Sequence, residues 1–335
     1  MKTWVHLLVA VTAISIVSAQ DTLNFATIGE VKRLDPRIDK LIPRNAKIEV
    51  LTSGFIWSEG PAWDRKNDVL LFSDVWRNQV IQCKEGEGKS VYMEPSGYTG
   101  VEPHPRAMGS NGLIFDAEGQ LILCEHGDRR VSLLTHGGGK VTLEDNYKGK
   151  RLNSPNDVCV GSNGDIYFTD PYYGLPLQQE DPRKELDFAG VYLRRKSGEL
   201  VLVVSNLGNP NGVCLSPDEK TLYVSNRNDD WIGYMAYPVN EDGTVGTGRM
   251  FYDATEDSKK QQGGADGIRT DTQGNLWATG QGGVYVFSPE GDVLGKIETG
   301  ERIANCAFGN DGSVLYITSD TYLCRIQTSA TGNGF

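Results

Sequence analysis

The sequence lacks the short motifs that most often reveal a catalytic mechanism. It has no C-x-x-C pair, which leaves a cysteine-bound zinc cluster with little support and argues against redox chemistry. It has no G-x-S-x-G segment to indicate a serine triad, and no glycine-rich loop that would cradle a phosphate. Candidate site residues therefore have to come from residues that recur along the chain.

Positive charge is in deficit. The chain has 33 Lys and Arg against 44 Asp and Glu, a formal net charge of −11. Nucleic-acid binding requires a positive patch, so we expect no nucleic-acid partner. The acidity fits the binding of a cation, although a solvated acidic surface explains most of it equally well.

Long apolar runs are absent after residue 19, so no later segment could cross a membrane. Residues 1–19 resemble a secretory signal peptide: Lys2 gives a positive start, an apolar core runs from Trp4 to Val17, and Ala19 ends a small-residue cleavage site. The alternatives are a membrane anchor or a buried first strand, but the run is short for a bilayer span. We expect a secreted, extracellular protein (periplasmic in a bacterium) with no membrane contact after cleavage.

Cysteine is sparse but even in number. The six cysteines are Cys83, Cys124, Cys159, Cys214, Cys306 and Cys324. An even number in a secreted chain permits disulfides. Three of them, Cys159, Cys214 and Cys306, lie within apolar runs, where free buried thiols are common. The pairing stays open, with Cys83 and Cys324 as one candidate pair because both fall late in neighbouring repeat units.

Glycine, in contrast, is plentiful, with 40 residues spread along the chain, as strands joined by tight turns require. One segment recurs. In its copy at residues 211–226, a polar residue and a glycine precede a short apolar run, a Pro-Asp turn and a second apolar run. We interpret this segment as two antiparallel strands. The copies start at Glu59, Asn111, Asn156, Asn211, Asp266 and Asn305.

Each copy is followed by a third strand and usually a fourth, for example at residues 190–195 and 200–204. Six units of four strands predict an all-β fold, a six-bladed β-propeller of antiparallel sheets. Residues 47–51 can supply the outer strand of the last blade and close the ring, which avoids exposed sheet edges. A two-sheet sandwich also has many short strands, but it does not require six similar units. We predict a signal peptide at 1–19, an N-terminal arm at 20–46, the propeller domain at 47–328 and a C-terminal tail at 329–335.

The six starting residues should meet at one mouth of the central channel, because the first strand of each blade lines that channel. Every one of them carries a side-chain oxygen. Asn and Asp before Gly also make turns, but turns explain only one or two positions, and Glu59 is a poor turn former. Two carboxylates with several amides suit a hard cation. We therefore predict a divalent cation at this mouth, Ca²⁺ first, with Mg²⁺, Mn²⁺ and Zn²⁺ as the alternatives.

Two loops should shape a pocket above this mouth: residues 171–190, which include Tyr172, and residues 93–110. A cation at the base of such a pocket would polarise a carbonyl or phosphoryl oxygen. Asp266 is the best candidate for the base, with Glu59 second. His126 is a candidate proton shuttle, although a lone histidine is more often structural.

Five short segments, spaced as the blades are, resemble the gluconolactonase/regucalcin family of six-bladed propellers. They are SEGP (58–61), SPND (154–157), FTDP (168–171), NPNG (209–212) and GADG (264–267). The segment CEHGDRRV (124–131) also resembles the gluconolactonase branch of that family. The similarity covers nearly the whole chain from about residue 47.

The resemblance implies a divalent-cation-dependent hydrolase that opens lactones, with a small-molecule lactone as its partner. By motif, the metal ligands would be Glu59, Asn156, Asn211 and Asp266, and Asp266 would be the base. The substrate-binding residues would be Asn156, Arg151, Asn153 and Tyr172. Here Ser154 and Pro155 separate Arg151 and Asn153 from the ligand position, which departs from the family pattern.

Two other functions fit the same residues. One is a metal-dependent phosphotriesterase or arylesterase, as in the related diisopropyl fluorophosphatase. The other is a non-catalytic propeller that binds a ligand, with the cation holding the ring together. Asn111 and Asn305 have no role in the family pattern, and the sequence does not indicate an oligomeric state.

Overall fold

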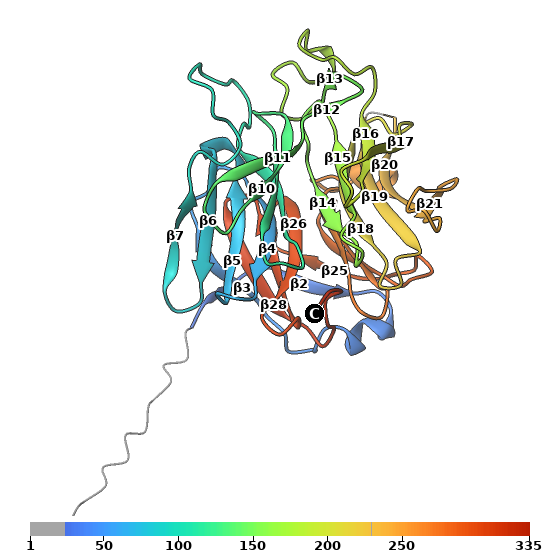
Figure 1. Ribbon diagram of the computed structural model, residues 1–335. Helices are drawn as coiled ribbons and strands as arrows, with labels where there is room; N and C mark the ends of the chain where they lie inside the picture. The colour runs from blue at the N-terminus through green and yellow to red at the C-terminus, as the bar shows by residue number, and fades with distance from the viewer. Residues whose placement is uncertain (1–23, 229) are drawn as a thin grey trace, which may run out of the picture.

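Six antiparallel sheets surround a central axis in the computed structural model, which describes residues 24–228 and 230–335 (Figure 1). The predicted signal peptide at 1–19 lies outside the described residues. The first strands of the six blades contact one another in chain order around the ring, and the last contacts the first. The prediction of a six-bladed propeller with four-stranded blades is confirmed.

Blades 1 to 3 follow the chain from the inner strand to the outer strand. Blade 1 is β4 (Ser58–Asp64), β5 (Val69–Asp74), β6 (Gln79–Lys84) and β7 (Gly88–Met93). Blade 2 is β8 (Ser110–Phe115), β9 (Leu121–Glu125), β10 (Arg130–Leu134) and β11 (Lys140–Glu144). Blade 3 is β14 (Val158–Val160), β15 (Ile166–Asp170), β16 (Gly190–Arg194) and β17 (Leu200–Val204).

Blades 4 to 6 repeat the same order. Blade 4 is β18 (Pro210–Leu215), β19 (Thr221–Arg227), β20 (Ile232–Pro238) and β21 (Arg249–Asp253). Blade 5 is β22 (Ile268–Thr270), β23 (Leu276–Gly280), β24 (Gly283–Phe287) and β25 (Val293–Glu298). Blade 6 takes β26 (Ile303–Gly309), β27 (Val314–Ser319) and β28 (Tyr322–Gln327) from the end of the chain.

The ring closes through a strand from the N-terminal side of the chain, as predicted. β3 (Ile48–Ser53) runs antiparallel to β28, with Ile48 opposite Ile326, and so becomes the outer strand of blade 6. Both ends of the propeller therefore share one sheet. The edge that an open array would leave for aggregation is thereby removed.

Residues before β3 add a fifth strand to two blades. β1 (Ala26–Thr27) pairs with β3 in blade 6, and β2 (Glu30–Arg33) pairs with β25 in blade 5. The 3₁₀ helix η1 (Pro36–Lys40) follows and buries Ile38 in the core that blades 5 and 6 share. These elements cover edges that would otherwise expose unpaired backbone groups.

The remaining elements are short. They are the 3₁₀ helices η2 (Val75–Arg77) and η3 (Gln178–Glu180), the helix α1 (Thr255–Ser258) and the two-stranded pair β12 (Asn146–Tyr147) and β13 (Lys150–Arg151). No helix in the described part of the chain is both long enough and apolar enough to span a bilayer.

The hydrophobic core is divided into layers between neighbouring sheets. The second strands β5, β9, β15, β23 and β27 are buried at every residue. Aromatic side chains fill these layers, as where Tyr234 of blade 4 meets Phe287 of blade 5 at 5.6 Å between ring centroids. All six cysteines are buried in these layers and unpaired, so Cys83 and Cys324 form no disulfide. Burial raises the pKa of the Cys83 thiol to about 11.

Candidate functional site

The six residues that start the repeats form one buried ring, which we call the oxygen ring. Their exposed fractions are 6% or less. Neighbouring first strands approach closely because a glycine follows several of these residues. A Cβ on Gly60 would lie 2.0 Å from the carbonyl oxygen of Asn111, and one on Gly212 would lie 2.3 Å from that of Asp266. The glycines of the repeat therefore set the diameter of the ring.

Hydroxyl side chains on the second strands hold the ring backbone in place. Ser73 donates to the carbonyl of Asn111 at 2.9 Å, and Ser225 donates to the carbonyl of Asp266 at 2.7 Å. Thr169 makes the same bond to the carbonyl of Asn211 at 2.5 Å. Each bond joins one blade to the next. The position of a ring residue is thus fixed by its neighbour as well as by its own blade.

Two of the six ring residues, Glu59 and Asp266, are buried carboxylates. Burial, and then the nearby charge of Asp157, raise the pKa of Glu59 to about 7. Burial and the charge of Glu59 raise the pKa of Asp266 well above the ordinary aspartate value. Glu59 accepts hydrogen bonds from Trp57 Nε1 (3.3 Å) and from the Gly60 N–H (3.2 Å). These two bonds do not offset the cost of holding two anions out of water.

Several oxygens of the ring have no partner. Asn111 Oδ1, Asn211 Oδ1 and Asp266 Oδ1 of the ring, and Oδ1 of Asp157 next to Asn156, are buried without a hydrogen bond to any described residue. Buried polar atoms are normally satisfied, so a group of orphan acceptors in one place calls for a positive ligand. Within residues 24–228 and 230–335, no cluster of three or more His, Cys, Asp or Glu could hold a metal. Amide oxygens would therefore have to complete the shell, which favours a hard cation such as Ca²⁺.

A raised pKa alone does not identify these residues. Burial also raises the pKa of Asp170, at the end of β15, to about 7. Both oxygens of Asp170 are nevertheless occupied, because the N–H groups of Asn153 and Ser154 each donate to it at 2.8 Å. Asp170 is therefore a structural brace, and the unfilled oxygens single out the ring.

Sequence reasoning missed a buried ion pair below the ring. Asp157 follows Asn156 and is fully buried, and Arg269 Nη1 donates to its Oδ2 at 3.2 Å. Arg269 lies on β22 and Asp157 directly precedes β14, so the pair joins blades 5 and 3 across the channel. The available signal was a charged residue inside the first apolar run of the third and fifth repeats, Asp157 and Arg269. The pair balances one of the three carboxylates near the ring.

His126 lies beside Asn156. Its Nε2 is 3.4 Å from Asn156 Nδ2, and its side chain is 2% exposed. Burial lowers the pKa of His126 to about 4, so the imidazole is neutral at pH 7. A neutral Nε2 that faces an amide N–H acts as an acceptor. This hydrogen bond fixes the orientation of the Asn156 side chain, with its Nδ2 toward His126. A role of His126 in proton transfer stays a prediction.

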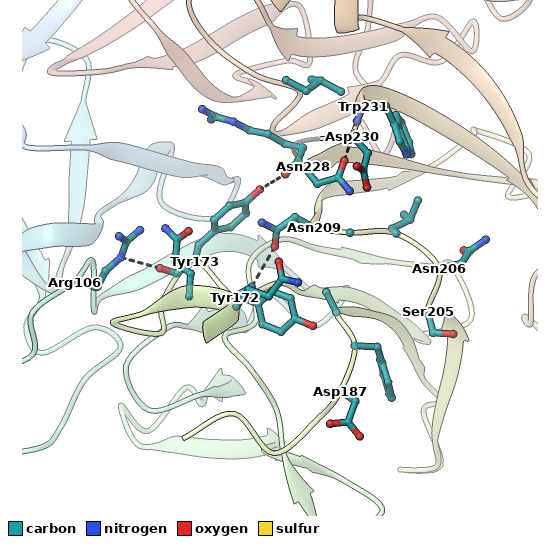
Figure 2. A pocket seen from close by; sticks show the side chains of 18 residues that line it. Arg106, Tyr172, Tyr173, Asp187, Ser205, Asn206, Asn209, Asn228, Asp230 and Trp231 are labelled. Atoms are coloured by element: carbon teal, nitrogen blue, oxygen red, sulfur yellow. Dashed lines mark hydrogen bonds between the residues drawn. The ribbon is translucent and has the colours of Figure 1, made fainter. Parts of the chain in front are cut away.

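Tyr172 and Tyr173 begin the loop after β15. Tyr172 is buried, and its N–H donates to Asn209 Oδ1 at 3.3 Å. The hydroxyl of Tyr173 donates to the carbonyl of Arg227 at 3.4 Å (Figure 2). Burial, with the nearby charge of Asp266, raises the pKa of Tyr173. Tyr173 therefore stands beside the oxygen ring, and the sequence had indicated its loop but not this residue.

Arg151 and Asn153 do not contact the ring residues through any hydrogen bond among the described residues. Arg151 is exposed on β13, and its guanidinium donates to the carbonyl of Asp128 at 2.8 Å. Asn153 is fully buried, and its Nδ2 donates to the carbonyls of Asp170 (3.1 Å) and Phe188 (3.0 Å). Asn153 thus ties the two ends of the 171–190 loop together. Substrate binding by Arg151 and Asn153 stays a prediction.

A cavity of about 1010 Å³ lies next to the ring, and we call it the rim pocket (Figure 2). Its walls come from residues 172–173, 178–179 and 187–189 of blade 3, residues 205–209 between blades 3 and 4, and residues 227–232 of blade 4, where residue 229 is not described. Arg106, from the predicted 93–110 loop, completes it, and its Nε donates to the carbonyl of Tyr173 at 3.3 Å. Both predicted loops therefore reach the same side of the ring.

The comparisons with known proteins agree with this architecture. Residues 57–321 match the model of the SMP-30/Gluconolactonase/LRE-like region. A gluconolactonase of Zymomonas mobilis is 37% identical over 327 residues, covering 94% of this chain and 90% of that protein. A 6-deoxy-6-sulfogluconolactonase of Pseudomonas putida is 34% identical over 276 residues, covering 79% and 83%.

Among solved structures, a gluconolactonase of Xanthomonas campestris superimposes with a TM-score of 0.78. It is 30% identical, and the match covers 90% of this chain and 97% of that one. The matched residues 57–321 span all six positions of the oxygen ring. The chain belongs to the SMP-30/gluconolactonase/LRE-like family.

Proposed function

We propose that this protein is a divalent-cation-dependent lactonase that hydrolyses sugar-acid lactones of the gluconolactone type. The observation that carries the proposal is the buried ring, in which two carboxylates with raised pKa values lie among oxygens that lack partners. Relatives across 90% and 83% of their own lengths carry gluconolactonase names, which supports a cyclic ester as the substrate. Ca²⁺ is the first choice of cation because the available donors are all oxygens.

Glu59, Asn156, Asn211 and Asp266 are the residues that would hold the cation. When bound, it supplies the positive charge that polarises the carbonyl of a lactone. Burial raises the pKa of Asp266 in the cation-free protein, and the charge of a bound cation would lower it. We assign Asp266 as the base that takes a proton from water as the water oxygen bonds to the carbonyl carbon.

In the rest of the reaction, the proton that Asp266 took from water is returned to the leaving oxygen. The bond between the carbonyl carbon and the ring oxygen breaks, and the leaving oxygen takes up a proton to become a hydroxyl. The product is an open-chain hydroxy acid. Asn156 is held by His126 at the edge of the ring, where its amide can orient the substrate. Tyr172 lines the rim pocket, through which the substrate would reach the ring.

Hydrolysis of a lactone panel tests this function. Purified protein is assayed on glucono-δ-lactone, other aldonolactones, phosphotriesters and aryl esters, with and without chelator. We expect lactones to be preferred, activity to require the cation, and both Asp266→Asn and Glu59→Gln to lose most of it. Glu87→Gln is the matched control, because Glu87 is a carboxylate with 67% of its side chain exposed, in the β6–β7 turn away from the ring.

Three outcomes would contradict the proposal. A preference for phosphotriesters over every lactone would favour the phosphotriesterase function. Cation binding without hydrolysis of any ester would favour a ligand-binding propeller. Equal activity of the Glu59→Gln and Glu87→Gln variants would show that hydrolysis does not depend on the carboxylate of Glu59 in the ring.

We also propose export from the cell, on the basis of the residue pattern at 1–19. Expression of the full chain in a secreting host tests it. The expected result is a protein in the medium or periplasm whose first residue is Gln20. Retention of the full chain in the cytoplasm would refute it.

A further inference from the structure

The rim pocket is larger than a single sugar lactone requires. Its volume of about 1010 Å³ lies at the upper end of the roughly 300–1,000 Å³ range of small-molecule sites. None of the six ring residues lines it. If the lactone ring reacts at the oxygen ring, most of this cavity is left for another part of the substrate.

The rim pocket lies next to the oxygen ring, on the side of Tyr173 and Arg227. Tyr173 and Arg227 line the pocket, and the Tyr173 hydroxyl donates to the Arg227 carbonyl at 3.4 Å. Burial and then the charge of Asp266 raise the pKa of Tyr173, while burial raises the pKa of Asp266 and the charge of Arg227 acts to lower it, so both side chains lie near the ring. Asn209, two residues before Asn211, lines the pocket floor and accepts the N–H of Tyr172. A substrate whose reacting group lies at the ring can therefore extend into the pocket past Tyr173.

The lining combines aromatic faces with uncharged polar groups. Trp231 is half-buried and lines the pocket, so it can present a ring face to a ligand. Tyr172 also lines the pocket but is buried, and Lys184 Nζ lies 5.1 Å from its ring centroid. Ser205 and Asn206 are exposed on the pocket wall, and their side chains make no hydrogen bond to other described residues. Aromatic rings pack against the C–H faces of a sugar, while amides and hydroxyls both donate to and accept from its hydroxyls. This combination fits a carbohydrate.

Charge on the lining favours a neutral ligand. The lining carries two guanidinium groups, Arg106 and Arg227, and two carboxylates, Asp187 and Asp230, so its formal charges balance although no ion pair between described residues joins them. The guanidinium of Arg106 donates to the carbonyl of Tyr173, and it also donates to Gln178 when the amide of Gln178 is turned to present its oxygen. A phosphate or sulfate group would need an excess of positive charge, and a long acyl chain would need an apolar wall. The lining has as many carboxylates as guanidinium groups, and its wall is largely polar.

We propose that the rim pocket is a glycosyl subsite, so that the substrate is an aldonolactone carrying a second, neutral sugar, such as the δ-lactone of an aldobionic acid. The proposal rests on the lactonase function given above. It also places the enzyme after a reaction class that oxidises the anomeric carbon of a disaccharide, because that oxidation generates such a lactone. The glycosyl unit remains intact, and only the ester bond is hydrolysed.

The test compares one ratio across three proteins. kcat/KM is measured on the δ-lactones of cellobionic and maltobionic acid and on glucono-δ-lactone, in the wild type, Trp231→Ala and Trp76→Ala. Trp76 is the matched control because it is 42% exposed and belongs to blade 1. In the wild type we expect kcat/KM on each disaccharide lactone to be about tenfold higher than on glucono-δ-lactone. Trp231→Ala should bring the two kcat/KM values close to each other. Trp76→Ala should keep the wild-type difference.

A second measurement does not depend on any variant. Cellobionate and gluconate, the hydrolysis products, are compared as inhibitors of the wild type, and the disaccharide acid should bind about tenfold more tightly. Hydrolysis of gluconolactone with no preference for either disaccharide lactone and equal product inhibition would overturn the subsite and leave the lactonase function intact. Absence of hydrolysis on every lactone would overturn both.

Discussion

Glu59→Gln should change stability in opposite directions with and without the cation. Glutamine has nearly the shape of glutamate but carries no charge, and its one amide oxygen can accept from either Trp57 or Gly60, which donate to separate oxygens of Glu59. In the cation-free protein the charged carboxylate is destabilising, because burial and Asp157 raise its pKa from 4.5 to about 7. That rise corresponds to roughly 3 kcal/mol of unfolding free energy, since each pKa unit is worth about 1.4 kcal/mol.

The pH dependence follows from the direction of this shift. A carboxyl whose folded-state pKa is raised holds its proton more tightly when folded, so the cost is absent below pH 4.5. It grows as pH rises from 4.5 towards 7 and is complete above pH 7. With chelator at pH 8, Glu59→Gln should therefore be more stable than the wild type by up to roughly 3 kcal/mol, and near pH 4 the two should agree.

Urea unfolding followed by tryptophan fluorescence measures these differences, at pH 4 and pH 8, with chelator or with Ca²⁺. Saturating Ca²⁺ should stabilise the wild type and leave Glu59→Gln nearly unchanged, because a ligand that binds only the folded state adds to its stability. Glu87→Gln, on the exposed β6–β7 turn, should follow the wild type throughout. A loss of stability for Glu59→Gln in chelator at pH 8 would refute the reasoning, since it would make the carboxylate a structural acceptor.

Two further perturbations test the supports of the ring. Arg269→Met leaves Asp157 as an unpaired buried anion and should destabilise the protein by about 3–5 kcal/mol, with the Arg269→Met/Asp157→Asn double variant recovering most of it in denaturation measurements. A failure to recover would show that Arg269 contributes packing and not charge. Gly212→Ala places a Cβ 2.3 Å from the Asp266 carbonyl and should lower kcat/KM more than tenfold and cost about 1–3 kcal/mol. Gly137→Ala, where the nearest atom is 3.8 Å away, should change neither quantity, and equal effects of the two alanines would exclude a steric cause.

The propeller could be predicted because it depends on local patterns that recur. Each blade carries its own alternation of apolar runs and turns, so six copies give six independent indications of the same unit. Closure by residues 48–53 could also be predicted, because a ring without an outer strand in blade 6 would leave an edge. The pairing of β1 and β2 could not, because two and four residues are too short for a pattern to stand out.

The site was only partly accessible from the sequence for a related reason. Ring membership is a property of position in the repeat, which the sequence displays. The contact of Asp157 with Arg269 is different, because the two residues are 112 positions apart and meet only after the ring has closed. The position of Tyr173 beside the ring also depends on how the 171–190 loop folds back, and that loop is held by Asn153 through backbone carbonyls rather than by any periodic pattern.

The supports of the ring act on the backbone, and this explains how one position can vary without loss of the fold. Ser225 holds the carbonyl of Asp266, and Thr169 holds the carbonyl of Asn211, so neither bond depends on which side chain the ring residue carries. The glycines that follow four of the ring residues act on the same backbone by allowing the next strand to approach. A side chain at the ring can therefore be amide or carboxylate at little structural cost to its neighbours. The charge of the site then depends on which blades carry Glu or Asp, and in this chain those are blades 1 and 5, at Glu59 and Asp266.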